Sequence, residues 1–226
     1  MGFVRQSLTV AAKDLRAEFR TKEALNSSVA FALVILLLFS FAFEPTQEQT
    51  REIAGGLLWL AFAFAGALIL NRSFARELAN DCLDALVAAP LSGAALFLGK
   101  ALANFVLLVA VELISLPVFG IFYDVNWTRQ WGPLLAVVGL GTWGLTVVGT
   151  LFSALTVNLR LRELMLPMLV YPVLAPALLA AIQLTSPLVM GQPLNAELMV
   201  WLRLLAAFDV IFTALTLALV ETVLVR

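Results

Sequence analysis

The chain has 226 residues, of which 62% are hydrophobic and only 13% are charged, and its formal net charge is -1. Soluble domains carry about 25% charged residues, so this composition excludes an ordinary soluble protein and indicates a membrane protein. The near-neutral charge argues against a nucleic-acid partner, and the absence of histidine removes the commonest metal ligand and general base.

Residues 1–24 predict an amphipathic helix at the inner membrane surface. Apolar residues recur there at helical spacing while basic residues occupy other faces, the apolar set being Val4, Leu8, Ala11, Leu15 and Phe19. We expect this helix to lie in the membrane interface. The alternative is a cytoplasmic helix packed on protein.

Six later stretches are apolar over the roughly 20 residues that a helix needs to cross a bilayer. We predict an all-α membrane protein with one transmembrane domain, 1–226, whose spans lie at 26–43, 53–70, 101–123, 133–157, 164–184 and 198–225. A helix satisfies its backbone hydrogen bonds internally, which an open sheet cannot do in lipid.

The distribution of basic residues predicts the orientation of these spans. If the N-terminus is cytoplasmic, three of the 14 basic residues lie outside, namely Arg51, Arg129 and Arg203. The other 11 lie inside: Arg5, Lys13, Arg16, Arg20, Lys22, Arg72, Arg76, Lys100, Arg160, Arg162 and Arg226. Positive residues concentrate in cytoplasmic loops, so both termini are expected inside.

The inner connection, 71–100, is too long for a turn and contains RSFARELANDCLDALVAAP. Its apolar and acidic residues separate at helical spacing, and proline disfavours helix just before it, so we predict a short amphipathic helix that ends at Pro90. We interpret this segment as the contact for a cytoplasmic partner. The alternative is a helix that only caps the bundle.

The stretch SGAALFLGKALA superficially resembles a phosphate-binding loop. Such a loop places four residues between its glycines and a Ser or Thr after its lysine. Here five residues separate Gly93 from Gly99, and Ala101 follows Lys100. The chain is therefore not predicted to bind or hydrolyse ATP, and Lys100 is interpreted as a cationic anchor at the inner end of the third span.

Few ionisable residues lie within the spans, and an acid at membrane depth suggests a function. Glu112 and Asp209 are candidates for a translocation path, with helix packing as the alternative; Asp209 has Thr142 as a possible hydrogen-bond donor. Nothing places the two acids together for catalysis, and the one cysteine, Cys82, cannot make a zinc site alone. We predict no catalytic residue and no metal site.

The fourth and fifth spans carry residues that shape helices. Gly139, Gly141, Gly144 and Gly149 are expected to permit close helix contact. Pro167, Pro172 and Pro176 predict a kinked or broken fifth span, for gating or for packing alone.

Two stretches resemble the CcmB family of cytochrome c maturation proteins, also called haem exporter protein B. The first, 53–100, carries GLLW at 56–59, then Arg72, Phe74, Glu77, Leu83, Asp84, Leu86, Pro90, Leu91 and Lys100. The second, 154–179, carries ALTV at 154–157, then Arg160, Pro172 and Pro176. Length and span count agree with the family over nearly the whole chain.

The resemblance implies a non-catalytic permease subunit of an exporter-type ABC transporter in the bacterial inner membrane. ATP and Mg²⁺ would bind a separate ATPase, CcmA, expected in two copies, and the chain itself would hold no cofactor. Other implied partners are CcmC, CcmD, the haem chaperone CcmE and a second copy of this chain, with haem handled by the complex. ATP hydrolysis would then drive release of haem-loaded CcmE from CcmC.

We expect the inner connection to couple the ATPase to the spans through Arg72, Phe74, Glu77, Leu83, Asp84, Leu86 and Pro90. Three alternatives stay open from the sequence. The chain could be half of another ABC exporter, for a lipid-linked saccharide or a drug. It could also be a passive scaffold, or an intramembrane enzyme whose catalytic cluster is not evident.

Overall fold

The computed structural model describes residues 2–43, 48–75, 77, 92–125, 128–157, 159 and 161–224. All regular structure in these ranges is helical. The helices are α1 (Phe3–Thr21), α2 (Glu23–Ala42), α3 (Glu48–Arg72), α6 (Gly93–Phe122), α7 (Trp131–Thr156), α8 (Arg162–Val189) and α9 (Ala196–Leu224). The six from α2 onward are long and apolar enough to cross a membrane, as predicted.

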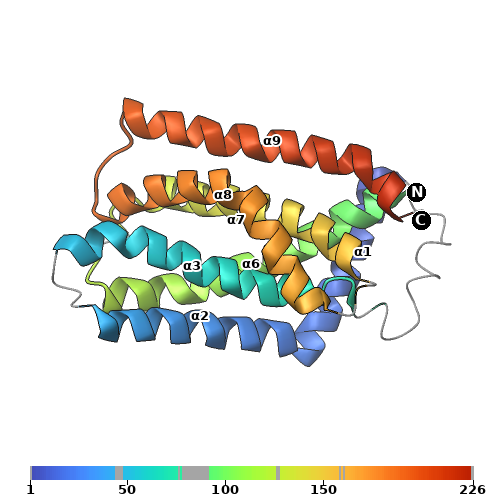
Figure 1. The fold of residues 1–226 in the computed structure, drawn as a ribbon, viewed down its shortest axis with the longest axis horizontal. Helices are drawn as coiled ribbons and strands as arrows, with labels where there is room; N and C mark the ends of the chain where they lie inside the picture. Colours follow the sequence, from blue (N-terminus) through green and yellow to red (C-terminus); the bar gives the residue numbers. More distant parts are fainter. Residues whose placement is uncertain are drawn as a thin grey trace.

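The spanning helices run side by side along the long axis, with α2 at one edge and α9 at the other (Figure 1). The spans of α3 and α7 are the most buried: 67% and 72% of the residues in an 18-residue apolar stretch of each helix lie inside the protein. The corresponding share is 28% for α2 and for α9. The apolar outer faces of α2 and α9 therefore remain free for lipid. Both termini lie at one end of the bundle, which we call the inner end.

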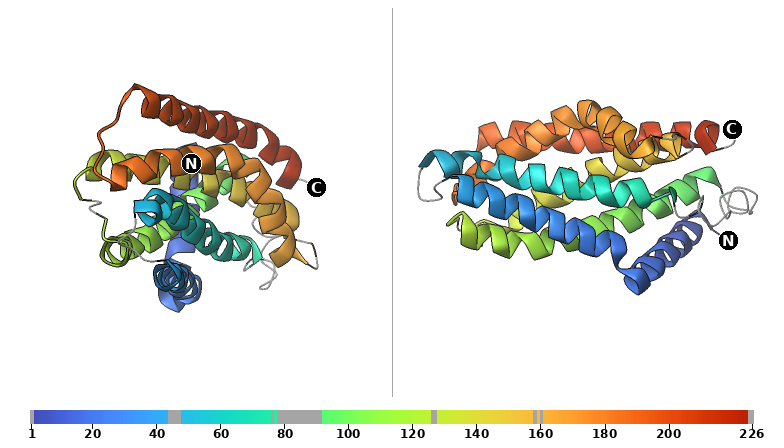
Figure 2. Two further views of the ribbon diagram at one scale, coloured as in Figure 1. Left: turned by 60° about the vertical axis from the view of Figure 1, so that its left-hand side comes forward. Right: turned by 60° about the horizontal axis from the view of Figure 1, so that its bottom comes forward.

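Helix α1 lies across the inner end at an angle to the spans (Figure 2). The chain turns from α1 into α2 at Lys22, whose φ of 56° is left-handed. The Lys22 N–H donates to the carbonyl of Glu18 at 2.6 Å, which closes the last turn of α1. Ser7, Val10 and Ala11 are buried while Val4 and Leu8 are exposed, so only one side of α1 packs on protein.

Helix α6 begins earlier than the sequence suggests. Ser92 caps its N-terminus by accepting from the N–H of Ala95 at 3.2 Å, and the helix continues without a break to Phe122. Residues 93–100, expected in the inner connection, therefore form the first two turns of α6. Most of the amphipathic helix predicted to end at Pro90, including residues 78–90, lies outside the described residues.

Glycines on α7 receive large side chains from α3. The ring of Trp59 lies where a Cβ of Gly141 would stand, and Leu70 occupies the corresponding space at Gly149. Trp59 also donates from its indole N–H to the hydroxyl of Thr185 on α8, at 2.9 Å. Gly139 was expected to serve the same purpose, but a Cβ there would meet nothing within 4 Å.

Helix α8 is one continuous helix although it contains Pro167, Pro172, Pro176 and Pro187. It changes direction part-way along its length (Figure 1). Proline removes one backbone hydrogen bond and crowds the preceding turn, which accounts for a bend without a break. The role of these prolines in gating stays a prediction.

Candidate functional site

A cluster of polar side chains lies at the inner end, where α1, the start of the inner connection, α6 and α7 meet. We call it the inner polar cluster, and its members are Lys13, Asp14, Ser73, Glu77, Lys100, Asn104 and Thr150. It joins parts of the chain that are far apart in sequence. The cluster is therefore the best candidate for a functional site on this end of the molecule.

Lys100 stands at the centre of the cluster, with its side chain fully buried. Its Nζ lies 2.8 Å from Glu77 Oε1, 3.1 Å from Asp14 Oδ2 and 2.6 Å from the carbonyl oxygen of Ser73. An ammonium group has three donors, and three acceptors are present. Lys100 is thus not the exposed membrane anchor that the sequence suggested, because its partners replace the water that it loses.

Phe74 completes the surroundings of this cation. Its ring centroid lies 4.7 Å from Lys100 Nζ, and its side chain is buried. A cation over an aromatic face gains about 2 kcal/mol when both groups are shielded from water. Phe74 therefore holds the start of the inner connection against α6.

Lys13 on α1 balances the charge of the cluster. Its Nζ lies 2.8 Å from Asp14 Oδ1 and 2.9 Å from Glu77 Oε1, so two lysines face two carboxylates. Partial burial acts to lower the pKa of Lys13, but hydrogen bonds and charge attraction from Asp14 and Glu77 outweigh it and raise the pKa above 10.5. Lys13 is therefore charged at neutral pH.

The cluster extends toward the membrane interior through Asn104. Its Nδ2 donates to Ser73 Oγ and to Thr150 Oγ1 on α7, both at 2.9 Å. A turn away, Ser153 Oγ of α7 donates to the carbonyl of Leu70 at 2.7 Å. The last turn of α3 and the start of the inner connection are thus fastened to both α6 and α7.

The residues expected to couple an ATPase fall into three groups. Arg72, at the end of α3, pairs with Glu23 of α2 at 2.8 Å, and both side chains are exposed. Phe74 and Glu77 are buried within the inner polar cluster. Leu83, Asp84, Leu86 and Pro90 lie outside the described residues. The coupling role of all of them stays a prediction.

The two acids of the spans lie at separate helix contacts. Glu112 on α6 is fully buried, and its Oε1 accepts from Thr142 Oγ1 of α7 at 2.6 Å. Asp209 on α9 lies against Gly144, where a Cβ would come within 2.7 Å of its Oδ1. Thr142, the donor suggested for Asp209, is thus bound to Glu112 instead. In the described part of the chain, neither carboxylate oxygen of Asp209 has a hydrogen-bond partner. Oε2 of Glu112 has none there either.

We expect Thr142→Val to lower the free energy of unfolding by about 1–3 kcal/mol, because it removes the donor from a buried carboxyl. The measurement is titration of the purified chain with sodium dodecyl sulfate. Thr216→Val is the matched control, since Thr216 is equally buried but donates only to Phe212 in its own helix. Equal losses from the two substitutions would contradict a specific tie between α6 and α7.

Sequence reasoning missed Lys13, Asp14, Ser73, Asn104 and Thr150 as members of one site. A signal was present in α6, where Lys100 and Asn104 stand four residues apart and so share a helix face. No such pattern connects α1 with α7. Among the described residues, no group of three His, Cys, Asp or Glu side chains could hold a metal ion.

A family model described as CcmB protein matches residues 5–224, nearly the whole chain. The chain belongs to the CcmB family. The resemblance seen in the sequence is thereby confirmed. Of the stretches that carried it, 53–100 supplies Ser73, Glu77 and Lys100 to the inner polar cluster.

Several proteins named Heme exporter protein B match most of the chain. Heme exporter protein B of Rhodobacter capsulatus is 32% identical over 172 residues, which are 76% of this chain and 78% of that protein. The protein of that name from Paracoccus denitrificans is 33% identical over 171 residues, covering 74% and 76%. The one from Pseudomonas aeruginosa is 27% identical over 207 residues, covering 92% of each.

Proposed function

We propose that this chain is the membrane-spanning subunit of an ABC transporter complex for cytochrome c maturation in the bacterial inner membrane. A separate CcmA ATPase, in two copies, supplies the energy. The chain couples hydrolysis to haem delivery, through release of haem-loaded CcmE from CcmC, with CcmD and a second copy of this chain as further partners. Membership of the CcmB family, together with the similarity to proteins named Heme exporter protein B, carries the proposal.

The inner polar cluster suits a coupling role. The inner connection leaves α3 at Ser73 and Glu77, both bonded to residues of α6. Glu77 also bonds to Lys13 of α1. If an ATPase displaced the inner connection, Glu77 would pull on its ion pairs with Lys100 of α6 and Lys13 of α1. Because buried ion pairs resist separation, α1 and α6 would move together with the inner connection.

In this mechanism Leu83 and Leu86 enter a groove of the ATPase. Asp84 and Pro90 orient the inner connection in that groove. Arg72, Phe74 and Glu77 hold the beginning of the inner connection against the helices. Glu112 and Asp209 are proposed as polar contacts on a path between α6, α7 and α9. Their unpartnered oxygens support that proposal, since a buried polar atom without a partner is costly and occurs mainly where it has a use.

The decisive experiment is co-purification of this chain with the candidate ATPase in nanodiscs, followed by ATPase assays with and without CcmC and haem-loaded CcmE. We expect hydrolysis that requires this chain and changes when the haem proteins are added. A stable complex whose hydrolysis ignores both haem proteins would contradict the proposal.

The coupling segment is tested by the double substitution of Asp84→Lys with Leu86→Asp. Reversing a charge and placing a carboxylate at an apolar anchor should abolish docking, so stimulation of the ATPase should fall at least tenfold while the chain still folds. The control is Asp124→Lys, an exposed acid at the opposite end of the bundle. Unchanged ATPase stimulation in the double variant would refute the coupling segment.

One feature favours a second candidate, an ABC exporter of a lipid-linked saccharide or a drug. A groove of about 180 Å³ lies between α3 and α8, lined by Gly56, Trp59, Leu60, Ala63, Phe64, Tyr171, Leu178 and Ile182. Its lining is mostly apolar and it opens at the bundle surface, which suits a lipid tail. ATPase activity stimulated by lipid and indifferent to haem proteins would select this alternative.

A further inference from the structure

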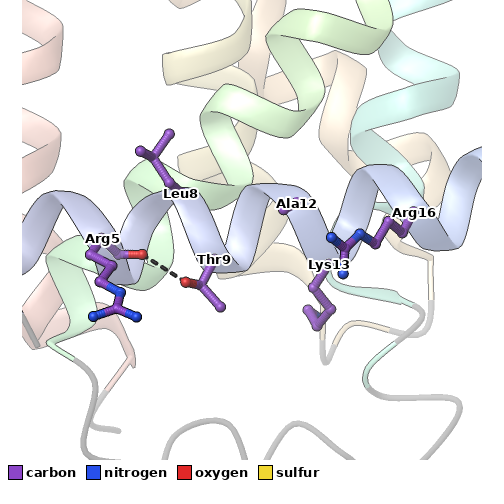
Figure 3. A pocket seen from close by; sticks show the side chains of 6 residues that line it. All are labelled: Arg5, Leu8, Thr9, Ala12, Lys13 and Arg16. Atoms are coloured by element: carbon purple, nitrogen blue, oxygen red, sulfur yellow. Dashed lines mark hydrogen bonds between the residues drawn. The ribbon is translucent and has the colours of Figure 1, made fainter.

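The outer face of α1 carries a groove of which the proposed coupling mechanism uses only Lys13. Its volume is about 490 Å³, and the described residues that line it are Arg5, Leu8, Thr9, Ala12, Lys13 and Arg16 (Figure 3). Arg5, Thr9 and Lys13 extend to one side of the helix, while Leu8 extends to the other. We call this surface the cationic groove.

Among the described residues, the two arginines of the cationic groove have no anionic partner. Lys13 is paired with Asp14 and Glu77, but neither Arg5 nor Arg16 makes an ion pair within the described part of the chain. Arg16 follows Arg5 by eleven positions, which is about three helical turns, so the two arginines project from the same face about 16 Å apart. A guanidinium group binds phosphate through paired hydrogen bonds, and phosphate is a natural partner for both.

An apolar strip borders the cationic groove. Val4, Leu8 and Phe19 recur at helical spacing and are 67%, 56% and 49% exposed. Because α1 lies across the inner end of the bundle, this strip can enter the acyl layer while the arginines stay at the depth of the headgroups. An acidic protein surface would satisfy the arginines but leave this apolar strip uncovered.

We propose that the cationic groove binds phosphate groups of anionic phospholipids in the inner leaflet. Binding would hold α1 flat on the membrane, and α1 in turn carries the Asp14 and Lys13 that complete the inner polar cluster. The proposal does not depend on haem or on an ATPase. It would hold for any multi-pass protein with this helix in this place.

The test places the purified chain in phosphatidylcholine nanodiscs with increasing fractions of phosphatidylglycerol. The readouts are the phosphatidylglycerol that native mass spectrometry finds on the released chain, and the thermal unfolding midpoint. An arginine beside an anionic surface changes partitioning about fivefold, so Arg5→Gln with Arg16→Gln should weaken the preference for phosphatidylglycerol about thirtyfold. High salt should weaken it for the wild type as well.

Arg203→Gln is the control for the loss of an arginine, because it removes one positive charge from an exposed site toward the outer end of α9. It should keep the lipid preference and its stabilising effect. An equal preference in the wild type and the double variant would overturn the proposal. So would a double variant that keeps its lipid but no longer co-purifies with a cytoplasmic protein, since the groove would then be a protein-docking face.

Discussion

Lys100→Met should lower the free energy of unfolding by about 3–5 kcal/mol. The substitution leaves Glu77 and Asp14, whose side chains are 7% and 20% exposed, without the buried cation that both contact. Breaking a buried ion pair from one side costs this much because a charge is stranded away from water. Titration with sodium dodecyl sulfate, followed by tryptophan fluorescence, measures the loss.

Two further variants make this result specific. Lys13→Met removes a half-exposed partner of the same carboxylates and should cost about 1 kcal/mol or less. Adding Glu77→Gln to Lys100→Met removes the more deeply buried of the two stranded carboxylates and should restore part of the lost stability. If the double variant is no more stable than Lys100→Met, the ion pair is not what holds the inner polar cluster together.

Gly99→Ala should displace α1 from α6 and cost about 1–3 kcal/mol. The added Cβ would stand 2.6 Å from the backbone oxygen of Ser7 and 2.6 Å from Val10 Cβ. Backbone cannot yield as a flexible side chain does, so the whole helix must move. Limited proteolysis of the N-terminal helix should become several-fold faster, because α1 no longer packs closely against α6.

Gly139→Ala is the matched control for this prediction. Gly139 also lies inside a spanning helix, but a Cβ there meets nothing within 4 Å. Alanine is the better helix former, so the variant should be as stable as the wild type or up to about 1 kcal/mol more stable. Similar proteolysis in both variants would show that α1 does not depend on contact at Gly99.

Both predictions concern residues whose role in the fold differs from the role that the sequence suggests. In the sequence, Gly99 and Lys100 end a stretch that only superficially resembles a phosphate-binding loop. In the fold, Gly99 lets α1 approach α6, and Lys100 bonds to the acid that α1 brings with it. The two adjacent residues therefore serve one helix contact. This shared contact can be recognised only from the packing of α1 against α6 in the tertiary structure.

The sequence alone determined the class of the protein, its six spans, the shared side of its termini and its resemblance to the CcmB family. Those properties follow from local runs of apolar residues, from loop charges and from motifs, each of which is read along the chain. The start of α6 lies earlier than the apolar run predicts, because Ser92 caps the helix and Gly99 packs against α1.

Only the tertiary structure decided which polar groups meet. Lys100, Asp14 and Thr150 come from three helices, and nothing in their spacing along the chain shows that they share one cluster. The same limit explains why Thr142 was suggested for Asp209 and is bound to Glu112. A buried polar side chain must find a partner, but the packing of helices determines which partner is within reach.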